Sequence, residues 1–290
     1  MSEPLLSLDT FATLVDGLDH PECVTWGPDG QVYAGGEAGQ IYRVGLDGSC
    51  REIACTGGFA LGLCLDATGA IYVCDIRRRA VLRVSLAGEV ATYSTGAPDR
   101  PLVNPNYPAF DRHGNLYVSD SGGWLKDDGC LLRIRPGGRT EVVSDAVRQF
   151  PNGMALGPGG THLYIALSTT EPGVVRVALG EDGSVGPPER VAHLPRTVPD
   201  GLAFDAAGNL YISCYTPNAI YRLSPAGELA LLAEDWQATT IAAPANLAFC
   251  GPDLRTLVIA SLSRWHLACA RVETPGLPLI YPEVAGWGGD

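Results

Sequence analysis

The sequence predicts an all-β protein with the fold of a six-bladed β-propeller, because one segment recurs six times at a blade-sized interval. The segment consists of a polar residue, an apolar run, a turn containing Gly or Asp, and a second apolar run. Clear copies begin at Pro21, Pro105, Pro151 and Pro199, and weaker ones begin at Ala60 and Pro244. Successive copies lie 39 to 48 residues apart, which is the length of a four-stranded propeller blade. We therefore expect six antiparallel blades in one domain that spans residues 1–290.

Each copy predicts two strands joined by a tight turn, because its apolar runs are rich in Val, Ile, Leu, Phe and Tyr and are separated by Gly-containing clusters. A third strand is expected after each copy, at residues 40–46, 80–86, 130–136, 174–180, 219–225 and 266–272. A fourth strand follows in the first five units, at residues 51–56, 90–95, 140–145, 190–195 and 229–234.

The sixth unit has no evident fourth strand, whereas the segment FATLVDG, residues 11–17, is an unassigned strand ahead of the first copy. We expect this N-terminal strand to complete the last blade and close the ring. Closure of this kind leaves no open sheet edge for other chains to pair with.

Composition narrows the class of protein. The chain has 290 residues, a net charge of −12 and a pI near 4.8, which argues against a nucleic-acid partner because phosphates would be repelled. No apolar stretch approaches the roughly 20 residues of a membrane span, and the N-terminus lacks the features of a signal peptide. Nine cysteines without a C-x-x-C pair are typical of reduced core thiols in a cytoplasmic protein.

One position of the repeat carries most of the functional signal. In the six copies it is occupied, in order, by Glu22, Leu61, Asn106, Asn152, Asp200 and Ala245. The first strand of a propeller blade lines the central channel, so these residues are expected to face one another at one mouth of the channel. Turn preference explains Asp and Asn. It does not explain Glu22 or the shared register.

Two carboxylates that face each other near a dry channel repel, and burial is costly unless they are neutralised. A divalent cation removes that cost. Carboxylate and amide oxygens suit Ca²⁺, Mg²⁺ or Mn²⁺, and Zn²⁺ also accepts carboxylates. The alternative is a hydrogen-bonded plug of the channel without a metal.

The openings PECVTW, PNGMAL and PDGLAF, with Glu in the first blade, Asn in the fourth and Asp in the fifth, resemble the senescence marker protein, regucalcin and gluconolactonase family of six-bladed propellers. The likeness covers about residues 9–280. It implies one divalent metal, calcium or zinc above all, held by Glu22, Asn152 and Asp200. It also implies that Asn106 reaches the substrate or a water on the metal, and that Asp200 is the general base of a lactone or ester hydrolase.

The third blade departs from the sugar-lactone pattern of that family. Where an Arg and an Asp are expected around the blade-3 asparagine, the chain has Asn104 and Tyr107. The departure favours a less polyhydroxylated, more apolar or aromatic substrate, with Trp124 and Trp265 at the mouth.

Loops that follow the second strands return to the same mouth of the channel. The longest, residues 119–129, carries Asp120 and Trp124 and is interpreted either as a pocket wall or as a surface turn. Asp120 could bind substrate or assist as an acid or base, but Asp75 occupies the same place in a blade with no polar channel residue. Of the five histidines, His20 is the one expected near the mouth.

Two functions therefore remain open from the sequence. The first is a metal-dependent hydrolase of the lactonase or esterase type, acting on a small molecule. The second is a non-catalytic propeller that binds a small ligand or calcium, because fold does not dictate function.

Overall fold

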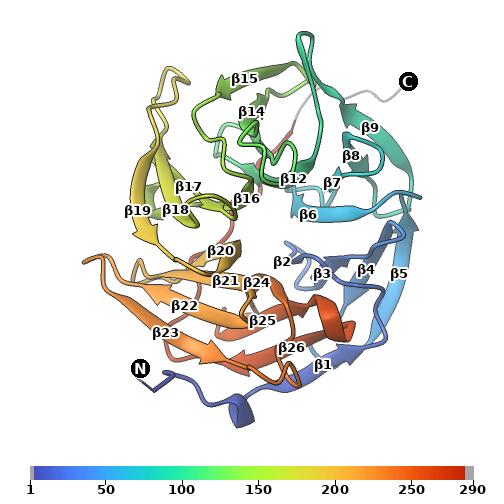
Figure 1. Ribbon diagram of the computed structural model, residues 1–290. Helices are drawn as coiled ribbons and strands as arrows, with labels where there is room; N and C mark the ends of the chain where they lie inside the picture. Colours follow the sequence, from blue (N-terminus) through green and yellow to red (C-terminus); the bar gives the residue numbers. More distant parts are fainter. Residues whose placement is uncertain (1–2, 285–290) are drawn as a thin grey trace.

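Six four-stranded antiparallel sheets surround a central channel in the computed structural model, which describes residues 3–284 (Figure 1). This arrangement is a six-bladed β-propeller and confirms the predicted fold class. The innermost strands are β2, β6, β12, β16, β20 and β24, and each contacts the inner strands of its two neighbours. The polar positions singled out in the sequence all lie at this inner layer.

The blades, numbered in chain order, are built from consecutive strands written from the channel outward. Blade 1 contains β2 (Val24–Trp26), β3 (Val32–Gly35), β4 (Gln40–Val44) and β5 (Cys50–Cys55), and blade 2 contains β6 (Ala60–Leu65), β7 (Ile71–Asp75), β8 (Ala80–Val84) and β9 (Val90–Ser94). Blade 3 contains β12 (Pro105–Phe110), β13 (Leu116–Asp120), β14 (Cys130–Ile134) and β15 (Thr140–Ser144), and blade 4 contains β16 (Pro151–Leu156), β17 (His162–Leu167), β18 (Gly173–Ala178) and β19 (Glu189–His193). Blade 5 contains β20 (Val198–Phe204), β21 (Leu210–Thr216), β22 (Ala219–Leu223) and β23 (Leu229–Glu234), and blade 6 contains β24 (Pro244–Cys250), β25 (Thr256–Ser261), β26 (His266–Arg271) and β1 (Ala12–Asp16). The remaining elements are a two-stranded ribbon, β10 (Gly96–Ala97) and β11 (Arg100–Pro101), and the short 3₁₀ helices η1 (Leu8–Thr10), η2 (Pro158–Gly160) and η3 (Leu262–Arg264).

The N-terminal strand closes the ring, as predicted. β1 pairs antiparallel with β26, with Ala12 opposite Cys269 and Asp16 opposite His266, and Figure 1 shows it along the outer edge of blade 6. The preceding residues bond to blade 5, because the amides of Leu5 and Leu6 donate to carbonyls of β23. The first part of the chain therefore joins two blades before it enters blade 1.

The buried apolar side chains of the described residues form six clusters, one between each pair of neighbouring blades. Each blade buries both faces of its sheet, which is why its strands read as nearly continuous apolar runs. Phe11, just before β1, belongs to the cluster between blades 5 and 6, while Leu14 and Val15 pack against the cluster between blades 6 and 1.

A contact between a turn aspartate and a tyrosine of the second strand recurs in blades 1 and 2. In blade 1 the Tyr33 hydroxyl donates to the Asp29 carboxylate at 2.8 Å, and Arg43 donates to the same oxygen at 2.8 Å. Blade 2 repeats the contact, with the Tyr72 hydroxyl 3.2 Å from a carboxylate oxygen of Asp66. These groups lie in and beside the turn between the first two strands. The four polar channel positions, Glu22, Asn106, Asn152 and Asp200, lie at the opposite end of the channel, and we call them the polar ring.

The last described residues cross the end of the channel opposite the polar ring. We call residues 275–283 the C-terminal strap. Its backbone bonds to blade 5 through Leu277 and Phe204, and to blade 2 through Pro282 and Ala67, while the Tyr281 hydroxyl donates to the Trp26 carbonyl of blade 1 at 2.7 Å. In Figure 1 the strap passes in faint red behind the centre of the ring.

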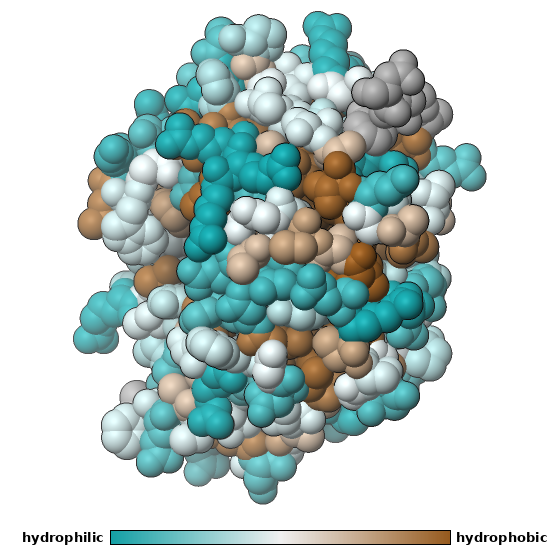
Figure 2. Space-filling view, turned by 90° about the vertical axis from the view of Figure 1, so that its right-hand side faces the viewer, coloured by the Kyte–Doolittle hydropathy of each residue, from teal (hydrophilic) through white to brown (hydrophobic). Residues whose placement is uncertain are grey.

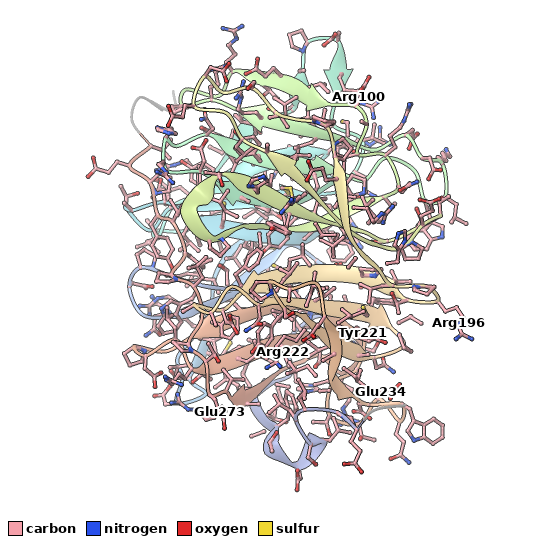
Figure 3. All side chains as sticks on the ribbon, turned by 90° about the vertical axis from the view of Figure 1, so that its left-hand side faces the viewer. Arg100, Arg196, Tyr221, Arg222, Glu234 and Glu273 are labelled. Carbon is pink, nitrogen blue, oxygen red and sulfur yellow. The ribbon has the colours of Figure 1, made fainter. Side chains whose placement is uncertain are left out.

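The two faces of the ring are thereby distinguished. Figure 3 views the ring edge-on and shows Arg196, which lies in the loop before β20, on one face, and Glu273, just before the strap, on the other. We call the first the upper face and the second the lower face.

The cysteines agree only in part with the expectation of reduced thiols in the core. All nine cysteines are free. Core positions were expected for them, but Cys50 and Cys55 are exposed, because they lie on the outermost strand of blade 1.

Figure 2 shows the outer edges of the blades on the right of Figure 1 as a mosaic of hydrophilic and hydrophobic side chains. Within residues 3–284, no helix is long and apolar enough to cross a membrane.

Candidate functional site

The polar ring is formed by β-bulges in the inner strands. Asn106, Asn152 and Asp200 lie inside β12, β16 and β20, where the pairing with the second strand shifts register, and not ahead of the strands as expected from the sequence. A bulge leaves its residue without a ladder partner and re-aims the side chain. Glu22 alone precedes its inner strand, β2.

Glycines next to two of these residues allow the inner strands to approach closely. A Cβ on Gly153 would collide with the carbonyl oxygen of Asp200, and one on Gly201 would lie 2.7 Å from the Cα of Asn246. Only glycine avoids such contacts with a neighbouring backbone. The Asn-Gly and Asp-Gly pairs of blades 4 and 5 therefore bring these two positions together at the channel.

A serine fixes the orientation of the Asn152 amide. Asn152 is 5% exposed, and its Nδ2 donates to the Ser168 hydroxyl at 3.1 Å. The same hydroxyl donates at 2.7 Å to the carbonyl of Pro199, the residue before Asp200. Because Nδ2 is engaged, the Oδ1 atom is the group that Asn152 offers to a ligand.

Blade 3 contains the same arrangement one blade earlier. Asn106 Nδ2 donates to the Ser121 hydroxyl at 3.1 Å, and that hydroxyl donates at 2.7 Å to the carbonyl of Pro151. Two successive blades thus hold an asparagine with its amide oxygen free, and each serine also ties its blade to the next one.

The two carboxylates of the ring are electrostatically coupled. Burial raises the pKa of Glu22 to about 8, with a further contribution from the nearby Glu37 carboxylate. Burial raises the pKa of Asp200 well above its ordinary value, and the Glu22 charge adds to the effect. Neither carboxylate accepts a hydrogen bond from any group within residues 3–284, so no protein donor offsets their desolvation.

A charged network borders the site on the side of blade 1. His20 Nδ1 lies 3.0 Å from a carboxylate oxygen of Glu37, and Arg77 lies 3.3 Å from the other oxygen. The His20 ring also packs on Trp265, with centroids 4.6 Å apart. His20 and Trp265 therefore pack on each other in a network that includes Glu37, the carboxylate that acts on Glu22, and their place at the upper mouth stays a prediction.

Tyr107 does not lie at the mouth. Its side chain is hydrogen-bonded to Asn246, and burial raises its pKa. Blades 3 and 6 are opposite each other in the ring (Figure 1), so this pair spans the channel. We call it the Tyr107–Asn246 bar. Asn246 is 2% exposed and its Oδ1 has no partner within the described chain.

Asp120 is fully buried, and backbone groups occupy its carboxylate. The carboxylate accepts hydrogen bonds from the amides of Val103 at 2.7 Å, Asn104 at 2.9 Å and Gly122 at 3.0 Å. Its counterpart Asp75 is likewise buried and accepts from the Thr56 hydroxyl at 2.6 Å. In both blades the aspartate organises upper-face loops, and direct contact between Asp120 and a substrate stays a prediction.

The loop of residues 119–129 contacts the start of blade 4 through Trp124. Trp124 is 54% exposed, and its ring packs edge-on against Phe150, with centroids 4.9 Å apart. Phe150 directly precedes the inner strand that carries Asn152. Asn104, held under this loop, has a buried Oδ1 without a partner in the described chain.

The arrangement can bind a cation through oxygen atoms. Two carboxylates and two oriented amide oxygens come from four blades, a hard ligand set. The described chain contains no group of three or more His, Cys, Asp or Glu side chains that could hold a metal, so any metal here depends on asparagine as well as on Glu22 and Asp200.

These observations define a class of protein: a six-bladed β-propeller with a polar, oxygen-rich ring at one mouth of its channel. The chain belongs to the SMP-30/Gluconolactonase/LRE-like family, whose model matches residues 20–263. The family resemblance inferred from the sequence is thereby confirmed.

Individual relatives fit this assignment. The chain is 29% identical over 290 aligned residues to a 6-deoxy-6-sulfogluconolactonase from Pseudomonas putida, covering 88% of this chain and 92% of that protein. Among solved structures it superposes on XC5397 of Xanthomonas campestris, described as a gluconolactonase, with a TM-score of 0.78, 21% identity and coverage of 92% and 89% of the two chains. It also superposes on a calcium-binding regucalcin from Agrobacterium tumefaciens with a TM-score of 0.77, 18% identity and coverage of 93% and 97%.

Sequence reasoning missed four groups of this site: Ser121, Ser168, Glu37 and Asn246. The two serines could have been found, because each occupies the position directly after the second-strand end of its blade. Glu37 and Asn246 carry no such signal, since their roles depend on contacts between different blades.

Proposed function

We propose that the protein is a lactonase that holds a divalent cation at Glu22, Asn152 and Asp200. The observation that carries the proposal is the pair of carboxylates from blades 1 and 5, which are coupled to each other and accept no hydrogen bond within the described chain. A buried carboxylate without a donor is unfavourable unless a cation or a proton neutralises it. Family membership and the relatives named as lactonases support the same activity.

The ligand set fits a hard cation. Two carboxylates balance the charge of one divalent ion, and Ser168 leaves the Asn152 oxygen available as a third ligand. When bound, Ca²⁺ or Zn²⁺, or alternatively Mg²⁺ or Mn²⁺, would polarise the lactone carbonyl and acidify water.

The chain's own residues carry the proton transfers. Asp200 takes a proton from the water whose oxygen adds to the lactone carbonyl carbon. The bond between that carbon and the ring oxygen then breaks, and Asp200 returns the proton to the ring oxygen, which gives a hydroxy acid. Asn106, with Nδ2 fixed on Ser121, accepts through Oδ1 from the attacking water or from a substrate hydroxyl.

Substrate contacts are assigned to the upper mouth. The unpartnered Oδ1 of Asn104 can accept a hydrogen bond, and Trp124 with Phe150 supplies an apolar wall. Asp120 holds the loop that carries Asn104. The Tyr107–Asn246 bar forms the floor of the site, so Tyr107 limits how deeply a substrate can enter.

The activity is tested with a panel of lactones and aryl esters, assayed after chelator treatment and again with added Ca²⁺, Zn²⁺, Mn²⁺ or Mg²⁺. We expect lactone hydrolysis that depends on the added cation. Cation binding without turnover of any member of the panel would favour the non-catalytic alternative instead.

Substrate preference is a separate prediction. The protein lacks the charged pair expected for sugar lactones in blade 3, and a charge-assisted hydrogen bond typically contributes on the order of 2 kcal/mol, about thirtyfold in selectivity. We therefore expect a simple aliphatic or aryl lactone to have a higher kcat/KM than gluconolactone or its 6-sulfo derivative. Trp124→Ala should reduce this preference, whereas Trp236→Ala, an exposed tryptophan without a ring contact in the described chain, should not. Gluconolactone as the best substrate of the panel would contradict the assignment.

The serine that orients Asn152 gives a prediction with an internal control. Ser168→Ala removes a donor and an acceptor from buried partners, so we expect about 1–3 kcal/mol of lost stability and about 10–100-fold weaker cation binding, as for other groups that orient metal ligands. Ser121→Ala makes the same change around Asn106, which is outside the proposed ligand set. It should cost similar stability in urea denaturation but leave the calorimetric cation affinity within about threefold. Equal effects of both variants on cation affinity would argue against Asn152 as the specific ligand.

A further inference from the structure

A cavity of about 370 Å³ occupies the lower part of the channel, and its walls are almost entirely apolar. All six inner strands line it with aliphatic or aromatic residues past the polar ring, among them Leu63, Phe110, Met154 and Phe249. For comparison, an apolar cavity of about 150 Å³ stays free of water and binds benzene. A cavity more than twice that size can hold a medium-length hydrocarbon chain.

This cavity is separate from the candidate active site. The Tyr107–Asn246 bar crosses the channel between them, and Tyr107 lines the cavity from above. On the lower side the C-terminal strap covers the channel with Leu277, Leu279 and Tyr281. The Tyr281 hydroxyl is already engaged, because it donates to the Trp26 carbonyl, and the Tyr107 side chain pairs with Asn246.

The rim of the cavity carries one charge. Arg112, in the turn after β12, is the single charged side chain among the described residues that line the cavity. One of its guanidinium nitrogens donates to the Gly159 carbonyl in the neighbouring turn of blade 4. Within residues 3–284 no carboxylate forms an ion pair with Arg112, in contrast to Arg43 and Arg83, which pair with turn aspartates of their own blades.

The strap leaves this part of the rim accessible. Its hydrogen bonds go to blades 5, 6, 1 and 2, and among the described residues none joins it to the blade 3 turn that carries Arg112 or to the blade 4 turn that carries Gly159. Leu279, midway along the strap, lines the cavity and is 49% exposed. An apolar chain could therefore enter beside the strap while a charged end stayed at the surface next to Arg112.

We propose that the lower channel is a second binding site, for a medium-chain fatty acid whose hydrocarbon tail fills the cavity and whose carboxylate pairs with Arg112. The apolar walls select the tail, since burial of each methylene is favourable and no wall group offers it a hydrogen bond. The unpaired guanidinium selects the anionic head group through a charge-assisted bond. The site does not depend on the lactonase activity proposed for the other end of the channel.

The test is calorimetric titration of the full-length protein with decanoate, octanoate and decan-1-ol. We expect saturable one-to-one binding of decanoate, weakened about fourfold for each methylene removed, and weaker binding of the neutral alcohol. Ala109→Phe and Ala203→Phe, which fill the cavity from blades 3 and 5, should each weaken decanoate binding at least tenfold while a thermal melt shows that the fold is retained. Two positions are used so that a failure of one variant to fold does not end the test.

Three controls locate the ligand. Arg112→Gln should weaken decanoate binding about fivefold, whereas Arg139→Gln, an exposed arginine of blade 3 with the same charge change, should not. Asp200→Asn should leave decanoate binding unchanged, because that residue belongs to the upper site. The proposal is overturned if decanoate fails to bind, if both filled variants bind it normally, if decan-1-ol binds as tightly as decanoate, or if Asp200→Asn abolishes binding.

Discussion

Asp200→Asn is expected to lower lactone kcat/KM by at least about a thousandfold while leaving the metal-free fold at least as stable as the parent. The change keeps the shape of the side chain but removes the proposed base, which typically contributes about 10²–10⁴ in rate, and one of two charges that balance the cation. In metal-free protein, however, the parent carries a buried carboxylate that accepts no hydrogen bond within the described chain. Loss of that uncompensated group should not destabilise the fold.

The measurement is a set of thermal melts with chelator and with excess cation, combined with steady-state kinetics. A cation at 100 times its Kd stabilises the parent by about 2.7 kcal/mol, and most of this increment should disappear in Asp200→Asn and in Glu22→Gln. Leu61→Asn, at the equivalent position of blade 2, should leave both the increment and the affinity nearly unchanged.

Asp120→Asn is the matched control, because it neutralises another fully buried aspartate of the upper face. This carboxylate accepts three backbone N–H bonds, so its loss should cost about 1–3 kcal/mol with or without cation. A variant of Asp200 that keeps its activity, or a melting increment that survives in both ligand variants, would remove the metal site from the proposal.

The contrast between Asp200 and Asp120 shows what the sequence can predict about the site. Both aspartates were expected at the same mouth of the channel, because the repeat assigns each to a known strand end. The sequence could not predict which carboxylate is occupied, since that depends on where the loop amides of Val103, Asn104 and Gly122 lie. Burial and hydrogen bonding, more than position in the repeat, separate a structural aspartate from a candidate ligand.

Tyr107 illustrates the same limit across the ring. The local sequence places it beside Asn106 and favours a role at the mouth. Its side chain is instead hydrogen-bonded to Asn246, a residue on the opposite blade. Contacts between blades 3 and 6 follow from closure of the ring and from the bulges that re-aim inner-strand residues, and neither leaves a pattern within one repeat.

The fold itself was predictable to the level of strand pairing, because each blade is a local unit of consecutive antiparallel strands. The non-local pairing between β1 and β26 was also predicted, since the last repeat lacked a strand and the first residues supplied one. That pairing has the largest expected effect on folding of any element.

Deletion of residues 1–17 should prevent the formation of a stable monomeric propeller. The deletion removes β1 and leaves β26 with an unpaired edge, which favours aggregation. It also removes Phe11, which is 8% exposed in the cluster between blades 5 and 6, and the bonds from Leu5 and Leu6 to blade 5. Loss of a buried Phe side chain alone costs about 3–5 kcal/mol, a large part of the roughly 5–15 kcal/mol that stabilises a typical domain.

Phe11→Ala separates the packing contribution from the pairing contribution, because it keeps the β1–β26 ladder intact. It should lower the free energy of unfolding by about 3–5 kcal/mol in urea without causing aggregation. Deletion of residues 1–4 is the length control and should leave the melting temperature unchanged, since Glu3 and Pro4 are exposed. A peptide of residues 5–17 added to the longer truncation should restore the melting transition, because it supplies the missing outer strand. If the protein lacking residues 1–17 melts within a degree or two of the full-length chain, β1 does not stabilise the closed ring.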